Sequence, residues 1–399
     1  MRKRVIAGTG CALADFVYNG LSFSDEKFSR YISVDAGDGG LSPGKLVFTE
    51  ELESFAGQPY PEILRTITGG DHSGVFNVGG PSIVSLIHAA QMLGSDHYTV
   101  KFFGMAGVDA TAGRIFDIVS RTPLDISNYL RTDSASTPFT DVFSDPGYDG
   151  GHGERTFVNN IGAACHFTPE MLTDEFFSAD ITCFGGTALV PQIHDSLESL
   201  LEKASSRGSV TVVNTVFDFR NEKLNPRRPW PLGRSREALR LMDILIMDAE
   251  ESLKISGTKD QENAVRYFID HNTPSFIITN GQNDMIAYSS GNGIFAPMPV
   301  IHMPVCSRIV RELKENPALK GDTTGCGDNF AGGVVTSIAL QLQTLPKGSL
   351  DLAQAMALGA ASGGFACYYL GGTYLEDRPF AKRDKVLAYC DNDNRSDAL

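Results

Sequence analysis

The sequence predicts an α/β fold, in which a largely parallel β-sheet is covered by helices on both of its faces. The first observation is that continuous apolar strands alternate with amphipathic helices along most of the chain. This pattern is typical of parallel sheets that are buried on both sides. The second observation is the 41 glycines, many of which stand in short pairs such as Gly69-Gly70 and Gly185-Gly186. Such pairs indicate many tight connections between strands and helices.

The N-terminal part of the chain is predicted to be extended. Residues 4–10 form a predicted buried strand that ends in a turn, and residues 11–18 continue as a second extended segment with Asp15 at its middle. Residues 20–70 are polar, rich in Gly, Ser and Pro, and lack sustained periodicity. Because this segment is long for a plain connection, we expect a substrate-facing loop or a small layer of strands there.

Strands and helices alternate through the rest of the chain. Gly79-Gly80-Pro81 opens an amphipathic helix that Gly94 ends. Strands near 138–144 and 154–158 flank a glycine-rich stretch, and we expect them to form a hairpin. The other predicted strands are 99–104, 181–184, 210–214, 244–247 and 276–279, and the predicted helices are 82–93, 110–120, 191–206, 234–242, 249–256, 261–270 and 352–369.

Carboxylates and glycines follow several of these predicted strands. In open α/β sheets a ligand binds outside the carboxyl ends of the strands. Asp218, Asp248, Gly281 and the loop 321–328 are all predicted to follow strands at that edge. We therefore expect these residues to share one crevice.

Length and composition limit the classes of function. The chain has 399 residues, which suits one large domain with additions or two domains. A net charge of −14 disfavours nucleic acid and anionic membranes as partners. No apolar run approaches the ~20 residues that span a bilayer. The seven cysteines are scattered without Cys-x-x-Cys spacing, so we expect reduced thiols in a cytoplasmic protein.

The most informative stretch is 320–333, which opens a long apolar helix. Small hydroxyl residues and glycines precede a helix N-terminus there, and Gly325 and Gly327 allow the backbone to approach a ligand. Free N–H groups and the helix dipole attract anions at such a site. Asp328 would repel a phosphate, so its presence favours work as a general base. The alternative is that Asp328 merely caps the helix.

The same stretch carries a resemblance to a known family. Residues 322–328 are Asp-Thr-Thr-Gly-Cys-Gly-Asp. They resemble the second signature of the ribokinase, or PfkB, family of ATP-dependent sugar and nucleoside kinases, which has Ala where this chain has Cys326. Gly79-Gly80 before a helix resembles the first signature of that family, and residues 103–109 resemble its Gly-x-x-Gly-x-Asp stretch. The resemblance extends over almost the whole chain.

This resemblance implies a single domain over residues 1–399. Its body would be a Rossmann-like, three-layer α/β domain, and a small β-sheet lid would come from about 20–70 and 135–160. The resemblance also implies ATP as the phosphoryl donor, Mg²⁺ as a cofactor, K⁺ as a further cation, and a small sugar or nucleoside as the acceptor. A homodimer formed through the lid is a further implication.

Roles for individual residues follow from the same resemblance. Asp328 would be the general base, and the backbone N–H groups of Gly325, Cys326 and Gly327 would stabilise the transferring phosphoryl group. The implied ATP-binding residues are Gly281, Thr324, Gly325 and Gly327; the implied acceptor residues are Asp15, Gly79, Gly80 and Arg155; the magnesium residues, acting through water, are Asp248 and Glu251; and Asp322 would bind a monovalent cation.

Some of these residues have a plain structural alternative. Asp248 and Glu251 suit a solvated helix start, where the helix dipole favours carboxylates. Gly281 suits a simple turn after a strand, and Arg155 suits a surface ion pair.

The chain also departs from the family pattern in ways that concern the acceptor. No Asn lies between Gly80 and Gly94, where the family has one that holds the sugar. Asp248 replaces the usual Asn of Asn-x-x-Glu, and the chain is longer at 20–70 and about 300–320.

Three other functions compete with that of a sugar kinase, and the residues favour them to different degrees. A nucleoside kinase similar to adenosine kinase fits the residues about as well as a sugar kinase. A non-catalytic sugar-binding regulatory protein would have lost Asp328 or the glycines, and neither is lost. A dehydrogenase is disfavoured, because the pair Gly8-x-Gly10 lacks the third glycine and the following helix of a dinucleotide site.

Overall fold

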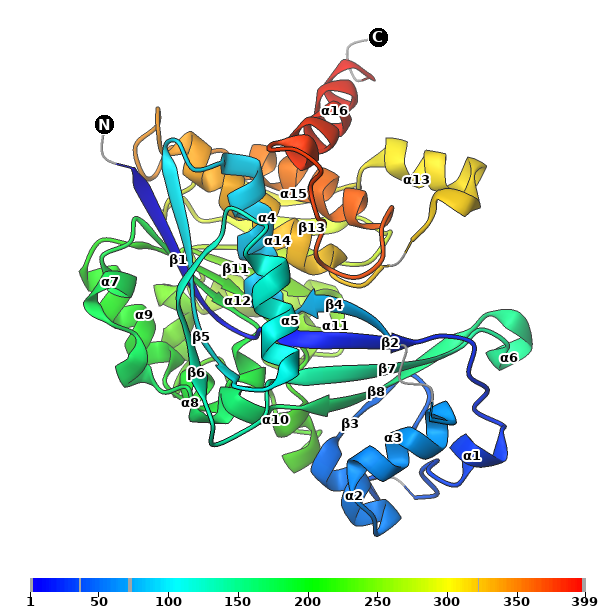
Figure 1. Cartoon of the computed structure of the whole chain (residues 1–399). Helices are drawn as coiled ribbons and strands as arrows, with labels where there is room; N and C mark the ends of the chain where they lie inside the picture. The colour runs from blue at the N-terminus through cyan, green and yellow to red at the C-terminus, as the bar shows by residue number, and fades with distance from the viewer. Residues whose placement is uncertain (1–2, 36, 71–73, 322, 397–399) are drawn as a thin grey trace.

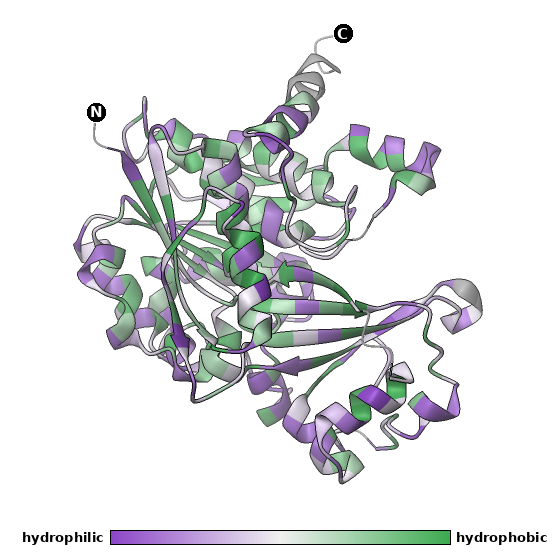
Figure 2. Cartoon of the chain, viewed as in Figure 1, coloured by the Kyte–Doolittle hydropathy of each residue, from purple (hydrophilic) through white to green (hydrophobic). Residues whose placement is uncertain are grey.

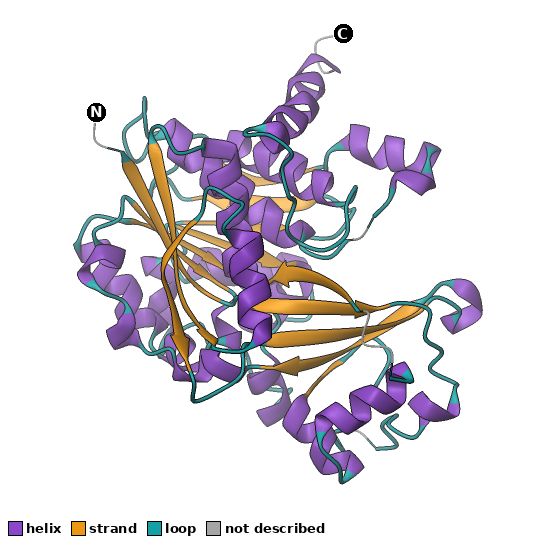
Figure 3. Cartoon of the chain, in the orientation of Figure 1, coloured by secondary structure: helices purple, strands orange, loops and turns teal. Residues whose placement is uncertain are grey.

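The computed structural model describes residues 3–35, 37–70, 74–321 and 323–396. A nine-stranded sheet has the order β14-β13-β12-β11-β10-β9-β1-β5-β6, and its strands from β11 to β6 are parallel (Figures 1 and 3). Its strands are β1 (Arg4–Gly10), β5 (Tyr98–Gly107), β6 (Asp125–Thr132), β9 (Ile181–Gly185), β10 (Val210–Asn214), β11 (Ile244–Asp248), β12 (Ser275–Thr279), β13 (Met285–Ser289) and β14 (Met298–Met303). Strand β12 is parallel to β11, whereas β13 and β14 are antiparallel additions at the edge. The predicted α/β class with a mainly parallel sheet is confirmed.

Helices cover both faces of this sheet, and a separate hydrophobic core lies under each layer. In β1 the neighbouring side chains of Ile6 and Ala7 point into different cores, because successive residues of a strand face opposite ways. Figure 2 shows the strands of the large sheet as mainly hydrophobic. One layer contains α4 (Pro81–Leu93), α5 (Ala110–Val119), α14 (Cys326–Gln341) and α15 (Leu352–Ala366), and the other contains α7 (Asp174–Phe177), α8 (Pro191–Asp195), α9 (Leu197–Ser206), α11 (Ala249–Ser256) and α12 (Gln261–Asp270).

A smaller second sheet projects from this body (Figure 1). Its order is β3-β8-β7-β2-β4, with the strands β2 (Leu13–Tyr18), β3 (Leu46–Phe48), β4 (Val75–Gly79), β7 (Phe139–Asp145) and β8 (Glu154–Asn160). One of its faces packs on the helices α1 (Glu26–Ser29), α2 (Thr49–Ala56) and α3 (Tyr60–Thr68) through a core of its own. The sheet thus begins at Leu13, before the 20–70 segment that we predicted for a lid.

Several predicted elements differ from the structure. Residues 20–70 hold three helices and one short strand, where the sequence predicted a loop or a layer of strands. The predicted helix 191–206 is divided at Ser196, and 234–242 is a 3₁₀ helix over Arg236–Leu241. The predicted strand before the glycine loop is replaced by α13 (Ser307–Glu315) and a 3₁₀ turn at Pro317–Leu319, which precede Gly321.

The remaining elements are α6 (Tyr148–Gly151), α10 (Phe219–Leu224), α16 (Ala381–Ser396) and the 3₁₀ turns Gly162–His166, Pro169–Met171 and Thr187–Leu189. Among the described residues, no helix is both long and apolar enough to cross a membrane.

Candidate active site

The N-terminus of α14 is shaped by glycine. Gly325 is the N-cap residue in the left-handed conformation, with φ 77°, and a Cβ atom there would lie 2.4 Å from the Cα of Gly372. A Cβ on Gly327 would meet nothing within 4 Å. The turn therefore packs tightly against its neighbour on one side and leaves open space beside Gly327, as a site for an anion requires.

Asp328 lies in the first turn of α14, as the sequence predicted. Burial raises the pKa of its carboxyl to about 7. A carboxylate with a pKa near neutrality can accept a proton more readily than an exposed one. Simple capping does not explain this residue, since Gly325 holds the cap position of the helix.

Asp15 sits in the second sheet, where β2 leaves the end of β1. It lies directly opposite Asn77 on β4 and Thr140 on β7. A Cβ on Gly79 would come within 1.9 Å of the Asp15 carboxylate, so a larger residue there would push this side chain from its position. Gly80 has φ 105° and its Cβ would meet the Cys11 carbonyl at 2.7 Å. The two glycines therefore shape the surroundings of Asp15.

Electrostatic effects place Asp15 and Asp328 around one residue that the sequence analysis did not select. The Cys11 thiol has its pKa raised first by burial, and then by the charges of Asp328 and Asp15. The same charge of Asp328 contributes to the raised pKa of Glu251. The charge of Asp328 therefore acts both on Cys11, which Asp15 also influences, and on Glu251.

The face of the second sheet that carries Asp15 contains a row of polar side chains. Cross-strand pairing brings Asn77, Asp15, Thr140 and Asn159 into one row across β4, β2, β7 and β8. Directly opposite residues share a face of a sheet. Phe16 and Phe76 point to the other face, where the guanidinium of Arg114 from α5 lies 3.9 Å from the Phe76 ring centroid.

Asn159 carries an unpaired oxygen beside a small cavity. Its Nδ2 donates to Thr140 Oγ1 at 2.8 Å, whereas its Oδ1 is buried without a hydrogen-bond partner. The cavity has a volume of about 10 Å³, and its lining includes Cys11, Leu13 and Asn159. A space of this size holds about one water molecule or hydroxyl group.

The second sheet reaches the glycine turn directly. The guanidinium Nη1 of Arg155, on β8, donates to Thr324 Oγ1 at 3.2 Å. Arg155 shares its face of β8 with Asn159, because the two residues are separated by four positions along a strand. The polar face therefore looks toward the start of α14.

Asp248 and Glu251 form a capping box at the start of α11. Glu251 N donates to Asp248 Oδ1 at 2.7 Å, and Asp248 N donates to Glu251 Oε2 at 3.0 Å. Thr215 Oγ1 also donates to Glu251 Oε2 at 2.6 Å. Burial and the charge of Asp248 raise the pKa of Glu251 to about 7. Asp248 and Glu251 thus stabilise the start of α11, which is the structural role considered for them above. Their closeness also concentrates negative charge, which is unfavourable.

The other predicted ligand positions are less constrained. Gly281 has φ 58° in the turn that follows β12, and a Cβ there would meet nothing within 4 Å. Asp322, predicted to bind a monovalent cation, lies outside the described residues. Within the described part of the chain, no group of three or more His, Cys, Asp or Glu side chains could hold a metal ion.

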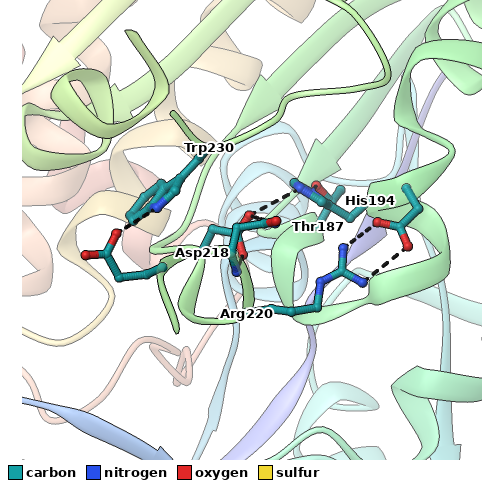
Figure 4. Close-up of polar contacts among 8 residues, drawn as sticks. Thr187, His194, Asp218, Arg220 and Trp230 are labelled. Atoms are coloured by element: carbon teal, nitrogen blue, oxygen red, sulfur yellow. Dashed lines mark hydrogen bonds and ion pairs between the residues drawn. The ribbon is translucent and has the colours of Figure 1, made fainter. Parts of the chain in front are cut away.

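Asp218 has a structural partner instead of an open position (Figure 4). Its Oδ2 lies 3.4 Å from His194 Nε2, and its other oxygen accepts from Asn221 N. Burial alone would raise its pKa, but His194 and Asn221 together hold it below the ordinary value. Thr187 Oγ1 contacts the other ring nitrogen of His194 at 3.0 Å. Asp218 therefore caps the N-terminus of α10 and is paired with His194.

Sequence reasoning missed Cys11, Asn77, Thr140 and Asn159. No linear motif marks them, and their shared face depends on strand register, which the sequence did not provide. Asn77 does precede Gly79-Gly80 by two positions, and this spacing was the one available signal.

The fold is of the α/β class, with a large, mainly parallel sheet and a second, smaller sheet. A family model described as the pfkB family of carbohydrate kinases matches residues 65–378, most of the chain, and the protein belongs to this family. A search of curated proteins finds no match.

Similar solved structures include sugar and nucleoside kinases. An adenosine kinase from Anopheles gambiae, in complex with a di(adenosine-5) tetraphosphate, has a TM-score of 0.67 and 20% identity, with 92% of this chain and 96% of that chain covered. A protein from E. coli assigned as ribokinase II, in complex with ATP and Mg²⁺, has a TM-score of 0.63 and 16% identity, with 97% and 99% covered. A fructokinase from Xylella fastidiosa with bound ATP has a TM-score of 0.62 and 17% identity, with 98% and 100% covered. At these identities the likeness shows the fold.

Proposed function

We propose that this protein is an ATP-dependent kinase that transfers the γ-phosphoryl group of ATP to a hydroxyl of a small carbohydrate. The observation that carries the proposal is Asp328, a carboxylate whose pKa burial raises to about 7, in the first turn of a glycine-opened helix. The ATP that accompanies the E. coli and Xylella fastidiosa neighbours supports ATP as the donor.

Positioning and charge stabilisation would supply most of the catalysis. Asp328 accepts the proton of the attacking hydroxyl. The N–H groups of Gly325, Cys326 and Gly327 stabilise the negative charge on the transferring phosphoryl group, and removing one such donor typically costs about 2.7–4 kcal/mol of barrier. In this proposal Thr324 and Gly281 would contact the nucleotide, and Arg155, which donates to Thr324, would contact the acceptor.

The residues present fit a divalent cation that is held mainly through water. Asp248 and Glu251 raise the cost of ionising each other, and Asp328 adds to it, so a nearby cation would relieve this repulsion. Mg²⁺ keeps several waters and needs only one or two protein carboxylates. When bound, it would neutralise charge on the phosphates of ATP. The monovalent cation at Asp322 and the homodimer stay predictions.

The polar row of the second sheet supports a sugar as the acceptor. Asp15 can accept hydrogen bonds from two hydroxyls. The unpaired Oδ1 of Asn159 can accept a third, beside a cavity that fits one hydroxyl. A polyhydroxylated acceptor would satisfy the Asn159 oxygen, whereas an apolar ring would leave it buried and unpaired.

A nucleoside is the second candidate for the acceptor. One step farther along the same strands, Val17, Val75, Val142 and Phe157 form an apolar row on the same face. Val75 is 45% exposed, so a base could pack there while the ribose meets the polar row. The adenosine kinase from Anopheles gambiae has a similar fold.

A panel of acceptors tests the proposal. Sugars, sugar phosphates, ketodeoxy acids and nucleosides would each be supplied with Mg·ATP, and ADP release would be measured. We expect ADP release that depends on a sugar. Activity with nucleosides alone would replace the sugar by the second candidate, and ADP release with none of these acceptors would contradict a kinase of small molecules.

A further inference from the structure

A buried lysine near the glycine turn has no part in the mechanism above. The Lys382 side chain, at the start of α16, is 1% exposed. Its Nζ donates to Asn329 Oδ1 at 2.8 Å. Burial lowers the pKa of Lys382 to about 7, although the charge of Glu376 opposes this shift. Because a buried ammonium group destabilises a fold unless it is well paired, this contact needs an explanation.

The partner of Lys382 is the side-chain amide of Asn329, whose other hydrogen bonds are also to groups of the protein. Asn329 follows Asp328 and is 0% exposed. Its Nδ2 donates to the carbonyl of Gly325 at 2.8 Å and to that of Gly372 at 2.9 Å. Its Oδ1 also accepts from the Tyr369 hydroxyl at 3.2 Å. A lysine ammonium only donates and a carbonyl only accepts, so these partners fix one orientation of the amide.

His88 on α4 is consistent with that orientation. Its Nδ1 lies 3.0 Å from Asn329 Oδ1, which is an acceptor, so Nδ1 carries the hydrogen. Burial, and then the charge of Lys382, hold the pKa of His88 below its ordinary value. A neutral His88 ring therefore shares the Asn329 oxygen with the Lys382 amino group.

The same amide sets the backbone that would face the phosphoryl group. Gly325 caps α14, and the two carbonyls that Asn329 holds belong to the touching residues Gly325 and Gly372. From the other side, Asn77 donates to the carbonyl of Leu370 at 2.8 Å and accepts from Thr373 N at 3.3 Å. Asn77 lies opposite Asp15 in the second sheet. The turn 370–373 thus connects the acceptor face to the glycine turn.

We propose that Asn329 and Lys382 are positioning residues that hold the glycine turn 325–327 in the geometry required for phosphoryl transfer. The ammonium of Lys382 holds the amide of Asn329, and the amide holds the carbonyls of Gly325 and Gly372. This inference rests on the proposed function of the turn as the anion site. Neither side chain touches the reacting atoms.

The first test replaces the ammonium by an apolar group of similar length. We expect Lys382→Met to lower kcat by about 10- to 100-fold, because misplacement of catalytic donors by about 1 Å has effects of this size. KM for ATP should change by less than about threefold, since the donors act on the transition state. Lys385→Met is the matched control, because Lys385 is exposed on the same helix and donates to the Tyr374 hydroxyl.

The second test leaves the lysine in place. Asn329→Asp still accepts from Lys382, but its second oxygen faces the two carbonyls that the amide held. We expect the fold to persist and kcat to fall as in Lys382→Met. In Lys382→Ala, added methylammonium should restore part of kcat, whereas the larger tetramethylammonium should not.

A binding measurement separates this inference from the proposed function. Aluminium fluoride with Mg·ADP imitates the transferring phosphoryl group, and calorimetry needs no acceptor. We expect wild type to bind Mg·ADP more tightly when aluminium fluoride is added, and Lys382→Met to lose this gain while binding Mg·ADP normally. Equal gains in both proteins, or an unchanged kcat with only a lower melting temperature, would overturn the positioning role. Failure of wild type to phosphorylate any acceptor would instead refute the kinase proposal.

Discussion

The two sides of the crevice are built in different ways. The glycine turn from Thr324 to Asp328 is contiguous in the sequence and forms the start of a single helix. The acceptor face takes Asn77, Asp15, Thr140 and Asn159 from four strands that pair only in the folded chain. In the proposed function, the residues for phosphoryl transfer are therefore contiguous in the sequence, whereas the residues that would bind the acceptor are brought together only by strand pairing.

The largest effect is expected at the local side of this comparison. Asp328→Asn removes the proposed base but keeps the shape of the turn, so kcat should fall by about 10²- to 10⁴-fold while ATP affinity is retained. Steady-state kinetics and calorimetry with ATP measure the two quantities. Asp260→Asn, which changes the exposed cap of α12, is the control and should leave kcat unchanged. Near-wild-type turnover in Asp328→Asn would remove this residue from the base role.

The same carboxylate predicts the pH dependence. Asp328 must be ionised to act as a base, and its pKa is raised to about 7. Activity should therefore rise about tenfold for each pH unit below 7 and level off above it. The pKa of Asp328 is higher in the folded than in the unfolded protein. The free energy of unfolding should therefore fall as the pH rises from about 4 to 7 and stay lower above pH 7. Asp328→Asn, which cannot ionise, should consequently melt at a higher temperature than wild type at pH 8 and at a similar one at pH 4.

A substitution in the proposed acceptor site should change the selectivity among acceptors. Asn159→Leu keeps the branched shape of the side chain but removes the unpaired oxygen, together with the amide that donates to Thr140. We expect kcat/KM for the best sugar to fall by about 10- to 100-fold with an unchanged KM for ATP. Deoxy analogues of that sugar sharpen the comparison. Wild type should discriminate against the analogue that lacks the hydroxyl read by Asn159, and the variant should not.

A substitution on the opposite face of the same sheet provides the control. Phe76 points away from the polar row and toward Arg114, so Phe76→Leu should leave the discrimination among deoxy analogues intact. If both variants lost it equally, the polar row would not be the feature that reads the acceptor.

The sequence predicted the features that depend on local patterns and missed those that depend on strand pairing. The order of parallel strands and helices was predictable because continuous apolar runs and amphipathic periods are local signals, and Asp328 stands in a contiguous motif. The helices within 20–70 were not predicted, since that segment shows no sustained period and its helices are stabilised by packing on the second sheet.

The missed site residues have a similar physical cause. Asn159 lies 144 positions after Asp15 in the sequence, and only the pairing of β2, β7 and β8 brings them into one row. The contact between Lys382 and Asn329 spans 53 positions and joins two helices. Neither relation has a spacing that a sequence pattern can show.

A smaller effect is expected at the magnesium residues. Glu251→Gln still accepts hydrogen bonds from Thr215 and Asp248 N, so the capping box persists while the charge is lost. The concentration of Mg²⁺ that gives half-maximal activity should rise several-fold. Glu250→Gln, one position earlier on α11, is the matched control. An unchanged magnesium dependence in Glu251→Gln would leave the capping box as the sole role of this residue.

The smallest effect is expected where the chain departs from the family signature. The Cys326 N–H donates to the Thr323 carbonyl at 3.3 Å, and in the proposed mechanism it would turn from there to the transferring phosphoryl group. The Cys326 Sγ lies 3.5 Å from the Sγ of Cys367, a separate contact of the side chain. Because alanine keeps the N–H group and the helical backbone, Cys326→Ala should retain kcat within about twofold. Cys326→Pro, which removes the N–H at the first position of the helix, should lose far more, although proline is sterically tolerated there. If both variants lost kcat equally, the thiol of Cys326 and not its backbone N–H group would be the group that matters. The glycine turn would then depend on a side chain as well.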